Sequence, residues 1–484
     1  MPTFEPVIGL EIHAQLLTAT KIFCGCSARF GAEPNTTLCP VCVGLPGALP
    51  VLNARVIEGA ARAALALGCR VNETSVFARK HYFYPDLPKG YQITQYDRPL
   101  ASDGRLTFRT GGRTVDLGIV RVHVEEDAGK SLHDAGGSGA TLVDFNRSGV
   151  PLIEIVTAPD LRSARDAADA FGRIREILVT VGVNDGNMEE GSLRCDANIS
   201  VRPEGAEVFG TKTELKNLNS FRYVQRAIEF EIARHIEALG AGARLAQETR
   251  QWDAETGRTA VMRTKEEADD YRYFPDPDLP PVELGEAWIE DLRRHLPELP
   301  EARRARFVAE YHLPEYDAEV LTQSVALAGY FERVAAASGN AKAASNWVMG
   351  EVMRKVNETR ASIDTLPVSA DALAELVRLV DSRAITGPIA KDVFEKMYAS
   401  GRGAAAIVRD EGLAAINDAD EIARVVAEVL RAHASAVADY RAGKTKSFGF
   451  LVGQVMKAMA GKGDPARVNE AVRRALEGAR EAGE

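Results

Sequence analysis

Two short runs of the chain, residues 7–16 and residues 119–127, alternate apolar and polar residues with a period of two. Successive side chains of a β-strand point to opposite faces of the sheet. The first run should therefore place Glu11 and His13 on one face and its apolar side chains on the other. Both runs predict strands that present carboxylate and imidazole groups on a common polar face.

The second run can be sorted in the same way. Its expected apolar face carries Val120, Val122 and Val124, and its expected polar face carries Arg121, His123, Glu125 and Asp127. Alternation of this kind is also what the solvated face of an antiparallel sheet shows. These two runs alone therefore leave both interpretations open.

A third run, residues 150–156, is apolar on both sides of a single carboxylate, Glu154. Burying an unpaired carboxylate is costly, so Glu154 needs a cation or a hydrogen-bonding partner. This requirement favours a functional polar face over a merely solvated one.

A fourth run, residues 192–201, places Arg194, Asp196, Asn198 and Ser200 on one face. Guanidinium, carboxylate and amide groups suit phosphate oxygens and a hard cation. We therefore expect the sheet to hold a divalent metal ion and a phosphorylated ligand, with Arg194, Asp196 and Asn198 as candidates for nucleotide or phosphate binding.

Four of the six cysteines, Cys24, Cys26, Cys39 and Cys42, form a C-x-C pair followed by a C-x-x-C pair. In a chain expected to be cytosolic this spacing is typical of a metal knuckle rather than of disulfides. The spacing predicts a bound Zn²⁺ with a structural role, because four thiolates leave no open coordination position. Free structural thiols are the alternative. Cys69 and Cys195 are expected to be small core residues.

The periodicity of the chain changes near residues 299 and 300. Before that point, strands dominate and capped helices are predicted to start at Asn53, Ser163 and Ser220; after it, amphipathic helical segments are predicted over 318–335, 341–356, 370–380 and 422–440. The pattern predicts an α+β fold with an antiparallel-sheet cradle followed by all-α middle and tail domains. We expect domains over residues 1–298, 299–403 and 404–484.

Two aromatic segments, residues 80–92 and 271–278, combine Tyr and Phe with Pro and with Lys or Arg. Aromatic rings beside cations can stack on bases. Rings fixed by proline more often attach a loop to the body of the protein, and the sequence leaves both roles open. A glycine cluster at residues 136–139 is expected to end a hairpin, because it lacks the strand-to-helix context of a phosphate loop.

Charge is unevenly distributed. The chain carries a formal net charge of -10, which argues against non-specific coating of nucleic acid. From Arg431 to the end there are ten Lys and Arg against six Asp and Glu. Lys444, Lys446 and Lys457 are therefore the candidates for RNA phosphate contacts, whereas the neighbouring Phe448 and Phe450 are expected to be core residues of a small helical bundle, with RNA contact as the alternative.

Several common motifs are missing. No run is apolar and long enough for a membrane span, and no leader pattern is present, so a cytoplasmic protein without a membrane partner is expected. Residues 443–445 resemble the end of a phosphate-binding loop, but Ala438 stands where its first glycine belongs. No G-x-S-x-G elbow is present, which argues against a serine hydrolase.

A set of longer segments is distributed over nearly the whole chain: residues 7–13, 30–35, 125–131, 151–156, 215–220, 269–275, 345–347 and 449–454. Together these segments resemble one known family, the B subunit of the tRNA-dependent amidotransferase.

The resemblance implies an ATP-dependent carbon–nitrogen ligase that amidates Glu-tRNA(Gln), Asp-tRNA(Asn) or both. It implies a heterotrimer with a glutamine-hydrolysing A subunit and a C subunit, a cradle-shaped N-terminal domain, and a helical tail that docks tRNA. It further implies that ATP and Mg²⁺ serve to phosphorylate the carboxylate of the misacylated tRNA. By this resemblance Glu11, His13, Glu125 and Glu154 correspond to the metal and phosphoryl-transfer cluster.

Two other functions compete with this interpretation. A zinc-bearing RNA-binding protein without catalysis would explain the cysteines and the basic tail, but not Glu154. A metal-dependent hydrolase would explain the acidic cluster, but not the tail. The sequence does not distinguish Gln from Asn charging.

Overall fold

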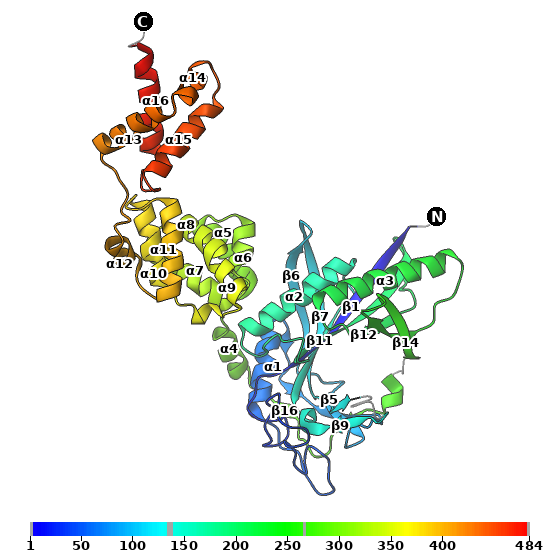
Figure 1. The fold of residues 1–484 in the computed structure, drawn as a ribbon. Coiled ribbons are helices and arrows are strands. Elements are labelled where there is room, and N and C mark those ends of the chain that lie inside the picture. Colours follow the sequence, from blue (N-terminus) through cyan, green and yellow to red (C-terminus); the bar gives the residue numbers. More distant parts are fainter. Residues whose placement is uncertain (1–2, 133–138, 265–267, 482–484) are drawn as a thin grey trace. The chain divides into compact units, whose positions relative to one another are not determined.

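The computed structural model describes residues 3–132, 139–264 and 268–481. These residues form two compact units, Met1–Glu301 and Ala302–Glu484, drawn as a ribbon in Figure 1. The first unit contains the sheets and the second is helical, which confirms the predicted α+β class.

A nine-stranded sheet dominates the first unit. Its strands, in spatial order, are β14 (Arg258–Thr264), β13 (Glu248–Asp253), β12 (Thr213–Lys216), β11 (Leu193–Pro203), β1 (Phe4–Gln15), β10 (Pro151–Thr157), β7 (Arg113–Glu126), β6 (Ala101–Thr110) and β2 (Arg70–Val71). Neighbouring strands are antiparallel, as predicted, except for the parallel pair β12–β13. That pair is parallel because the helix α3 (Phe221–Gly240) forms the crossover between its strands.

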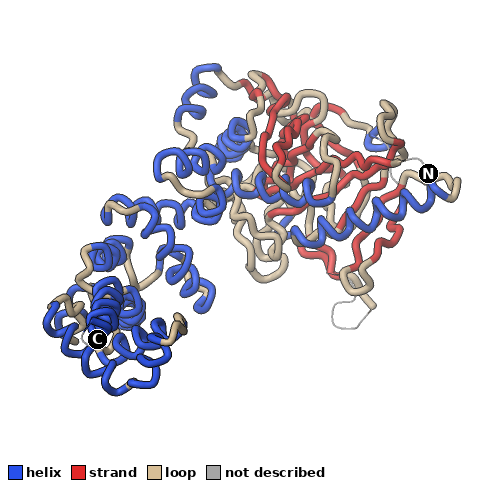
Figure 2. The backbone as a smooth tube through the Cα atoms, turned by 90° about the horizontal axis from the view of Figure 1, so that it is seen from above, coloured by secondary structure: helices blue, strands red, loops and turns tan. Residues whose placement is uncertain are grey.

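Three helices pack with the sheet around one apolar core: α1 (Ala54–Ala66), α2 (Ala164–Thr180) and α3. Figure 2 shows these helices against the strands. The predicted caps are confirmed, because the side chains of Asn53, Ser163 and Ser220 each accept a hydrogen bond from a backbone N–H in the first turn. The helices cover the face that carries Ile8, Leu10 and Ile12, which leaves Glu11 and His13 on the opposite, polar face.

The strand β7 departs from simple alternation at one residue. Arg121 faces Val156 on β10, but Ile119 already faces Thr157, so Val120 is an extra residue in β7. Such a bulge reverses the facing of the residues that precede it. Ile119 is buried and Val120 is 47% exposed. The predicted apolar face is therefore correct for Val122 and Val124 and wrong for Val120.

Smaller sheets lie at the end of the large one. The strands β4 (Phe77–His81), β5 (Tyr91–Gln95) and β15 (Phe274–Pro275) form one; β3 (Thr74–Ser75) pairs with β16 (Val282–Glu283), and β8 (Lys130–Leu132) with β9 (Leu142–Asp144). The helix α4 (Glu286–Arg294) follows β16. Of the predicted glycine turn, residues 136–138 lie outside the described residues.

The second unit is built from helices. They are α5 (Pro300–Tyr311), α6 (Glu315–Leu321), α7 (Val325–Ser338), α8 (Ala341–Trp347), α9 (Met353–Thr359), α10 (Ala370–Asp381), α11 (Gly387–Ser400), α12 (Ala404–Asp410), α13 (Ala419–Ala432), α14 (Ala434–Arg441), α15 (Lys446–Ala458) and α16 (Pro465–Glu481). A π-helical turn, Val348–Val352, joins α8 to α9. None of the helices in the described ranges combines the length and apolarity needed to cross a bilayer.

Two predicted helices of this unit are each divided into two. The segment 318–335 breaks before α7, because the side chain of Ser324 caps a new helix by accepting a hydrogen bond from the Leu327 N–H. The segment 422–440 breaks at His433, which ends α13 and precedes α14.

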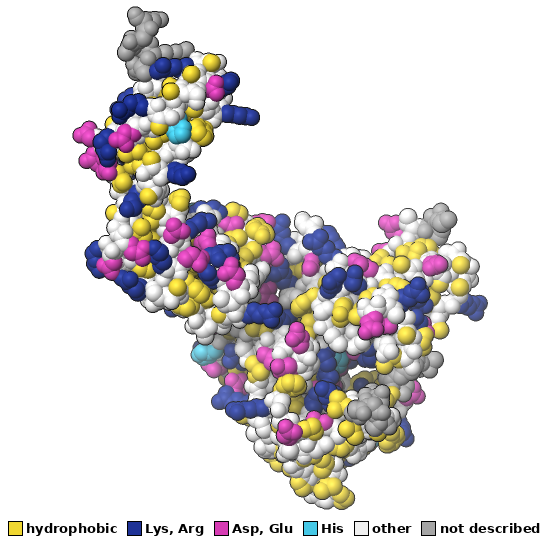
Figure 3. Space-filling model, in the orientation of Figure 1, with side chains coloured by type: hydrophobic (Ala, Val, Ile, Leu, Met, Phe, Trp, Pro, Cys, Tyr) yellow, Lys and Arg dark blue, Asp and Glu magenta, His cyan; other side chains and the backbone are white. Residues whose placement is uncertain are grey.

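Two separate apolar cores occur in this unit. One is built from α5 to α12 and includes Ala404, Ile407 and Val408; the other is built from α13, α15 and α16. The boundaries expected at residues 298/299 and 403/404 stay predictions. Phe448 packs against the last core, but Phe450 is 48% exposed, so the expectation of a core role fails for Phe450. On the face drawn in Figure 3, basic and acidic side chains are interspersed over the helices of this unit.

Candidate active site on the polar face of the sheet

The register of three adjacent strands aligns one row of polar side chains. His13 on β1 faces Glu154 on β10, and Glu154 faces His123 on β7. The Nε2 atoms of His13 and His123 lie 3.5 and 3.3 Å from Glu154 Oε2. Glu125 joins the group from β7, with its Oε2 atom 3.6 Å from His123 Nε2. Glu125 also accepts a hydrogen bond of 3.0 Å from the Thr94 hydroxyl on β5.

Burial and mutual contact set the charges of this cluster. Burial alone would lower the pKa of both histidines, but the neighbouring carboxylates outweigh it. They raise the pKa of His13 above its usual value, and for His123 alone the raised pKa is about 9. Burial conversely favours the neutral acids, yet the imidazoles hold the pKa of Glu125 below its usual value and that of Glu154 well below. The carboxylates of Glu125 and Glu154 are therefore ionised at neutral pH.

The same cluster fits a divalent cation. A ring nitrogen of His13 and carboxylate oxygens of Glu125 and Glu154 lie within 4.8 Å of one another. Carboxylate oxygens are the ligands that Mg²⁺ prefers, and a cation there would offset the negative charge that protons otherwise balance. Glu11 lies outside this group of ligand atoms, and its Oε1 accepts a hydrogen bond of 2.7 Å from Asn198.

Asp127, which follows β7, connects this side of the cluster to β1 and β11 through hydrogen bonds. Its carboxylate accepts hydrogen bonds of 2.8 Å from Gln15 and 3.0 Å from Arg194, and Arg147 lies 3.7 Å away. These cations lower the pKa of Asp127 despite its burial. Arg194 is thus positioned by Asp127 at the border of the polar face.

On the other side of β1, Asp196 is paired with Lys216 at 2.5 Å. Burial would lower the pKa of Lys216, but Asp196 and Glu214 raise it above its usual value, so the ammonium stays charged. The Oδ1 atom of Asn198 is buried without a hydrogen-bond partner among the described residues. A free buried acceptor beside Glu11 is what a bound ligand or ion would satisfy.

Sequence reasoning does not single out three residues of this site: His123, Thr94 and Lys216. Alternation places His123 on the polar face, but only the register shows that it lies opposite Glu154. Lys216 lies four residues before Ser220 on the short strand β12, and its pairing with Asp196 has no local sequence signal. Thr94 comes from the separate three-stranded sheet.

The two aromatic segments pack against each other. Tyr82 lies near Tyr271, with ring centroids 6.2 Å apart, and Tyr96 stacks on Tyr273 at 4.1 Å. Lys80 Nζ lies 4.7 Å from the centroid of the Tyr271 ring. These contacts join the two segments to each other and to the neighbouring Tyr96, and both roles of the rings stay predictions.

The four knuckle cysteines converge as their spacing predicts. One sulfur atom from each of Cys24, Cys26, Cys39 and Cys42 lies within 4.8 Å of the others, and all four are free thiols. A hydrogen bond from Cys24 lowers the pKa of Cys42 to about 4, helped by the buried ammonium of Lys21. A tetrahedral thiolate site for Zn²⁺ fits this donor set.

The tail lysines are distributed differently. Lys444 precedes α15 and pairs with Asp439 at 2.9 Å, whereas Lys446 and Lys457 lie within α15. They lie on the last helical bundle and not on the sheet unit.

Comparison with known proteins agrees with the geometry. A family model described as the GatB/GatE catalytic domain matches residues 6–290, which include the whole cluster, and one described as the GatB domain matches residues 329–476. The B subunit of the aspartyl/glutamyl-tRNA(Asn/Gln) amidotransferase of Trichlorobacter lovleyi is 54% identical over 475 residues, 98% of this chain and 100% of the relative. The protein of the same name from Myxococcus xanthus is 53% identical over 473 residues, 98% of each chain.

A buried carboxylate–imidazole cluster on a sheet is a suitable centre for a metal-assisted enzyme. With matches over nearly its full length, the chain belongs to the family of aspartyl/glutamyl-tRNA(Asn/Gln) amidotransferase B subunits.

Proposed function

We propose that this chain is the component of a tRNA-dependent amidotransferase that activates the side-chain carboxylate of Glu-tRNA(Gln), Asp-tRNA(Asn) or both. ATP is the phosphoryl donor and Mg²⁺ its metal. A glutaminase A subunit supplies ammonia, and a C subunit completes the heterotrimer. The observation that carries this proposal is the buried row His13–Glu154–His123, with Glu125 beside it.

The chemistry requires activation because a carboxylate is a poor electrophile for ammonia. An oxygen of the aminoacyl carboxylate attacks the γ-phosphorus of ATP, ADP leaves, and an acyl phosphate forms. Ammonia then attacks the acyl carbon and inorganic phosphate departs, which leaves the amide. When bound, Mg²⁺ offsets the charge of the phosphates as they approach the carboxylate.

The residues of the cluster have separate tasks in this scheme. Glu125 and Glu154 are the oxygen ligands that would hold the metal. His13, whose ring nitrogen belongs to the same group of ligand atoms, would hold the metal with them. His123 contacts both carboxylates, fixes their orientation and keeps them ionised. Arg194, Asp196 and Asn198, with Glu11, lie beside the cluster toward β11 and are assigned to the phosphate side of the site.

The remaining predicted sites have roles outside the phosphoryl transfer in this proposal. A Zn²⁺ ion on Cys24, Cys26, Cys39 and Cys42 stabilises the fold locally and takes no part in catalysis. Lys444, Lys446 and Lys457 contact tRNA phosphates from the tail bundle.

The test uses the assembled heterotrimer with misacylated tRNA and ATP in the absence of glutamine and ammonia. We expect ADP formation that depends on the misacylated tRNA. The substitutions Glu125→Gln and Glu154→Gln should each reduce it by at least about a hundredfold, the range found when groups that stabilise transition-state charge are removed. The matched control is Glu255→Gln, which changes an exposed carboxylate in the turn between β13 and β14. ADP formation unaffected by either cluster substitution would refute the proposal.

A further inference from the structure

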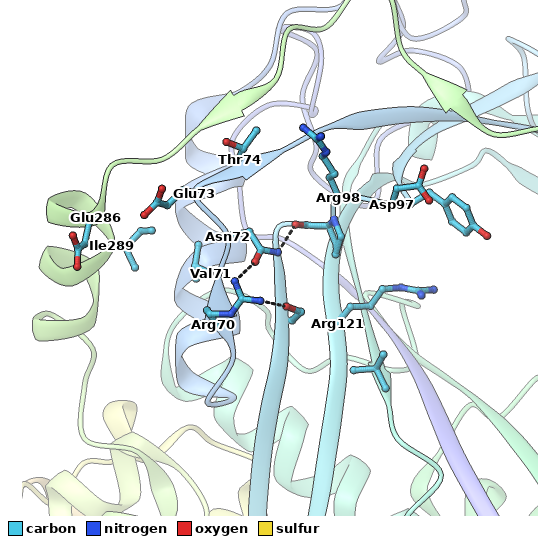
Figure 4. A pocket seen from close by; sticks show the side chains of 14 residues that line it. Arg70, Val71, Asn72, Glu73, Thr74, Asp97, Arg98, Arg121, Glu286 and Ile289 are labelled. Atoms are coloured by element: carbon cyan, nitrogen blue, oxygen red, sulfur yellow. Dashed lines mark hydrogen bonds between the residues drawn. The ribbon is translucent and has the colours of Figure 1, made fainter.

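The polar face continues beyond the cluster as a groove. It has a volume of about 860 Å³ and crosses the β7, β6 and β2 end of the sheet. Figure 4 shows its lining side chains, which come from β2 and the residues after it, from the turn 96–99 before β6, from β7 and from α4. A volume of this size is enough for a nucleoside-sized ligand.

Arg121 joins the groove to the cluster. Its Nε atom lies 3.4 Å from His123 Nδ1, and its neighbour on β10 is the apolar Val156. Arg121 makes no ion pair with a carboxylate in the part of the chain that the structure describes, because the adjacent Glu125 and Glu154 contact histidines instead. The two Nη groups of a half-buried guanidinium are thus available next to the reaction centre.

The charges along the groove differ between its two ends. Asp97 and Arg121 extend toward the same end in Figure 4, and neither forms an ion pair with a described residue. Glu73 and Glu286 lie at the opposite end. Arg70, which pairs with Asp103, and Arg98 also line the groove. A polyphosphate or a continuing RNA backbone along the whole groove would meet the carboxylates of Glu73, Asp97 and Glu286, which offset the charge of the three arginines. A ligand that bears one carboxylate and one ammonium close together fits the end near the cluster.

We propose that this groove is the subsite for the acidic aminoacyl group at the 3′ end of the tRNA, an inference that rests on the proposed function. Arg121 binds the side-chain carboxylate through two parallel hydrogen bonds and positions it beside the cluster. Asp97 accepts a hydrogen bond from the α-amino group. Tyr96, which is stacked on Tyr273 and 37% exposed, forms the wall against which the terminal base packs.

This assignment gives Arg121 a role in discrimination as well as in binding. The substrate side chain is a carboxylate, whereas the product side chain is a neutral amide. The guanidinium therefore binds the substrate more tightly than the product and favours release after amidation. Arg121 selects the acid over the amide.

The experiment uses two stable analogues, 3′-glutamylamino-3′-deoxyadenosine and its glutaminyl counterpart, which differ only in the side-chain charge. Their dissociation constants are measured by calorimetric titration of the intact heterotrimer. We expect the glutamyl analogue to bind about tenfold or more tightly than the glutaminyl one, as for a charge-assisted hydrogen bond. In Arg121→Gln the ratio of the two dissociation constants should fall to near one. Arg121→Lys should give an intermediate ratio, because lysine retains the charge but cannot form two parallel hydrogen bonds.

The matched control is Arg105→Gln, which removes a 70% exposed guanidinium on β6 that pairs with Asp116 outside the groove. It should keep the wild-type ratio. An unchanged ratio in Arg121→Gln overturns the proposal, as does equal binding of free glutamate and the glutamyl analogue. A selective rise in the KM for ATP, with the analogue ratio intact, overturns it in favour of a nucleotide subsite. Failure of the wild-type complex to form amide would count against the proposed function, whereas the titration still decides the groove.

Discussion

Glu154 is the residue on which the electrostatics of the site depend. The residues on either side of it in β10 are buried and apolar, and two imidazoles contact its carboxylate. The cost of burying a carboxylate is offset by these partners, so the cluster is already charged and oriented before any ligand arrives.

The first prediction concerns the metal at the residue scale. Glu154→Gln should weaken Mn²⁺ binding, used as a probe for Mg²⁺, by at least about tenfold, because it removes an oxygen ligand and breaks the contact with both histidines. Glu11→Gln should have a smaller effect, since Glu11 is hydrogen-bonded to Asn198 outside the group of ligand atoms. Electron paramagnetic resonance of Mn²⁺ titrations gives both affinities. An equal loss of Mn²⁺ affinity in the two variants would contradict this prediction and mean that Glu11 is also a metal ligand.

The sequence reveals part of this site because burial and alternation are local properties. Glu154 is conspicuous within its apolar run, and Glu11 and His13 follow from a period of two. The role of His123 depends on strand register, which is a long-range property. Lys216 and Thr94 reach the site from other strands and have no local signal.

At the scale of elements, a buried ionic network anchors α3 to the edge of the sheet. Glu231 on α3 contacts Arg234 at 2.7 Å and Arg250 on β13 at 3.1 Å, and it accepts a hydrogen bond from Thr259 on β14. Burial opposes ionisation of Glu231, but His235 and these partners outweigh it and lower its pKa to about 2.

This network predicts an acid-sensitive contribution to stability. A carboxylate with a lowered pKa stabilises the fold above its unfolded pKa, near 4.5, and loses that contribution as the pH falls toward 2. Glu231→Gln should therefore cost about 3 kcal/mol of unfolding free energy at pH 7, and less as the pH is lowered. Urea denaturation at several pH values measures the difference. The control is Glu229→Gln on the exposed side of α3, and a pH-independent difference would contradict the assignment.

The cysteine knuckle makes a second prediction at this scale. The purified protein should contain about one zinc per chain, held by four thiolates. Cys39→Ser should lower the zinc content and the thermal unfolding temperature, because metal-binding free energy contributes to folding. Metal analysis with calorimetry checks both, and less than about a tenth of an equivalent in the wild type would end the claim.

Elements were predictable where their signals are local. The caps at Asn53, Ser163 and Ser220 were visible as side-chain types at helix starts. The bulge at Val120 was not, because an extra residue in one strand is defined only by its partner strand. The break at His433 was missed because the amphipathic spacing continues across it.

At the scale of the whole molecule, the last apolar core is built from α13, α15 and α16, apart from the core that holds α12. The change of period near residues 299 and 300 indicated the sheet and helical units. The membership of α12 could not be predicted, because an amphipathic helix does not specify which core it joins.

Removal of the tail bundle tests its role in tRNA binding. Deletion of residues 416–484 removes the last core but keeps Ala404, Ile407 and Val408 in theirs. We expect weaker tRNA binding and a flatter salt dependence, by close to one unit of slope for each phosphate that the tail no longer neutralises. Filter binding at several salt concentrations measures both, and amide formation should persist at high tRNA concentration. An unchanged slope would show that the tail is not the docking element.

The central claim is that the aminoacyl carboxylate is phosphorylated before ammonia attacks it. This claim is tested most directly by labelling the side-chain carboxylate of the misacylated tRNA with ¹⁸O and following the inorganic phosphate by mass spectrometry. An acyl phosphate carries one carboxylate oxygen as its bridge to phosphorus, and that oxygen leaves with the phosphate when the amide forms. The account predicts one ¹⁸O transferred to phosphate for each amide formed; unlabelled phosphate at full amide yield would contradict it.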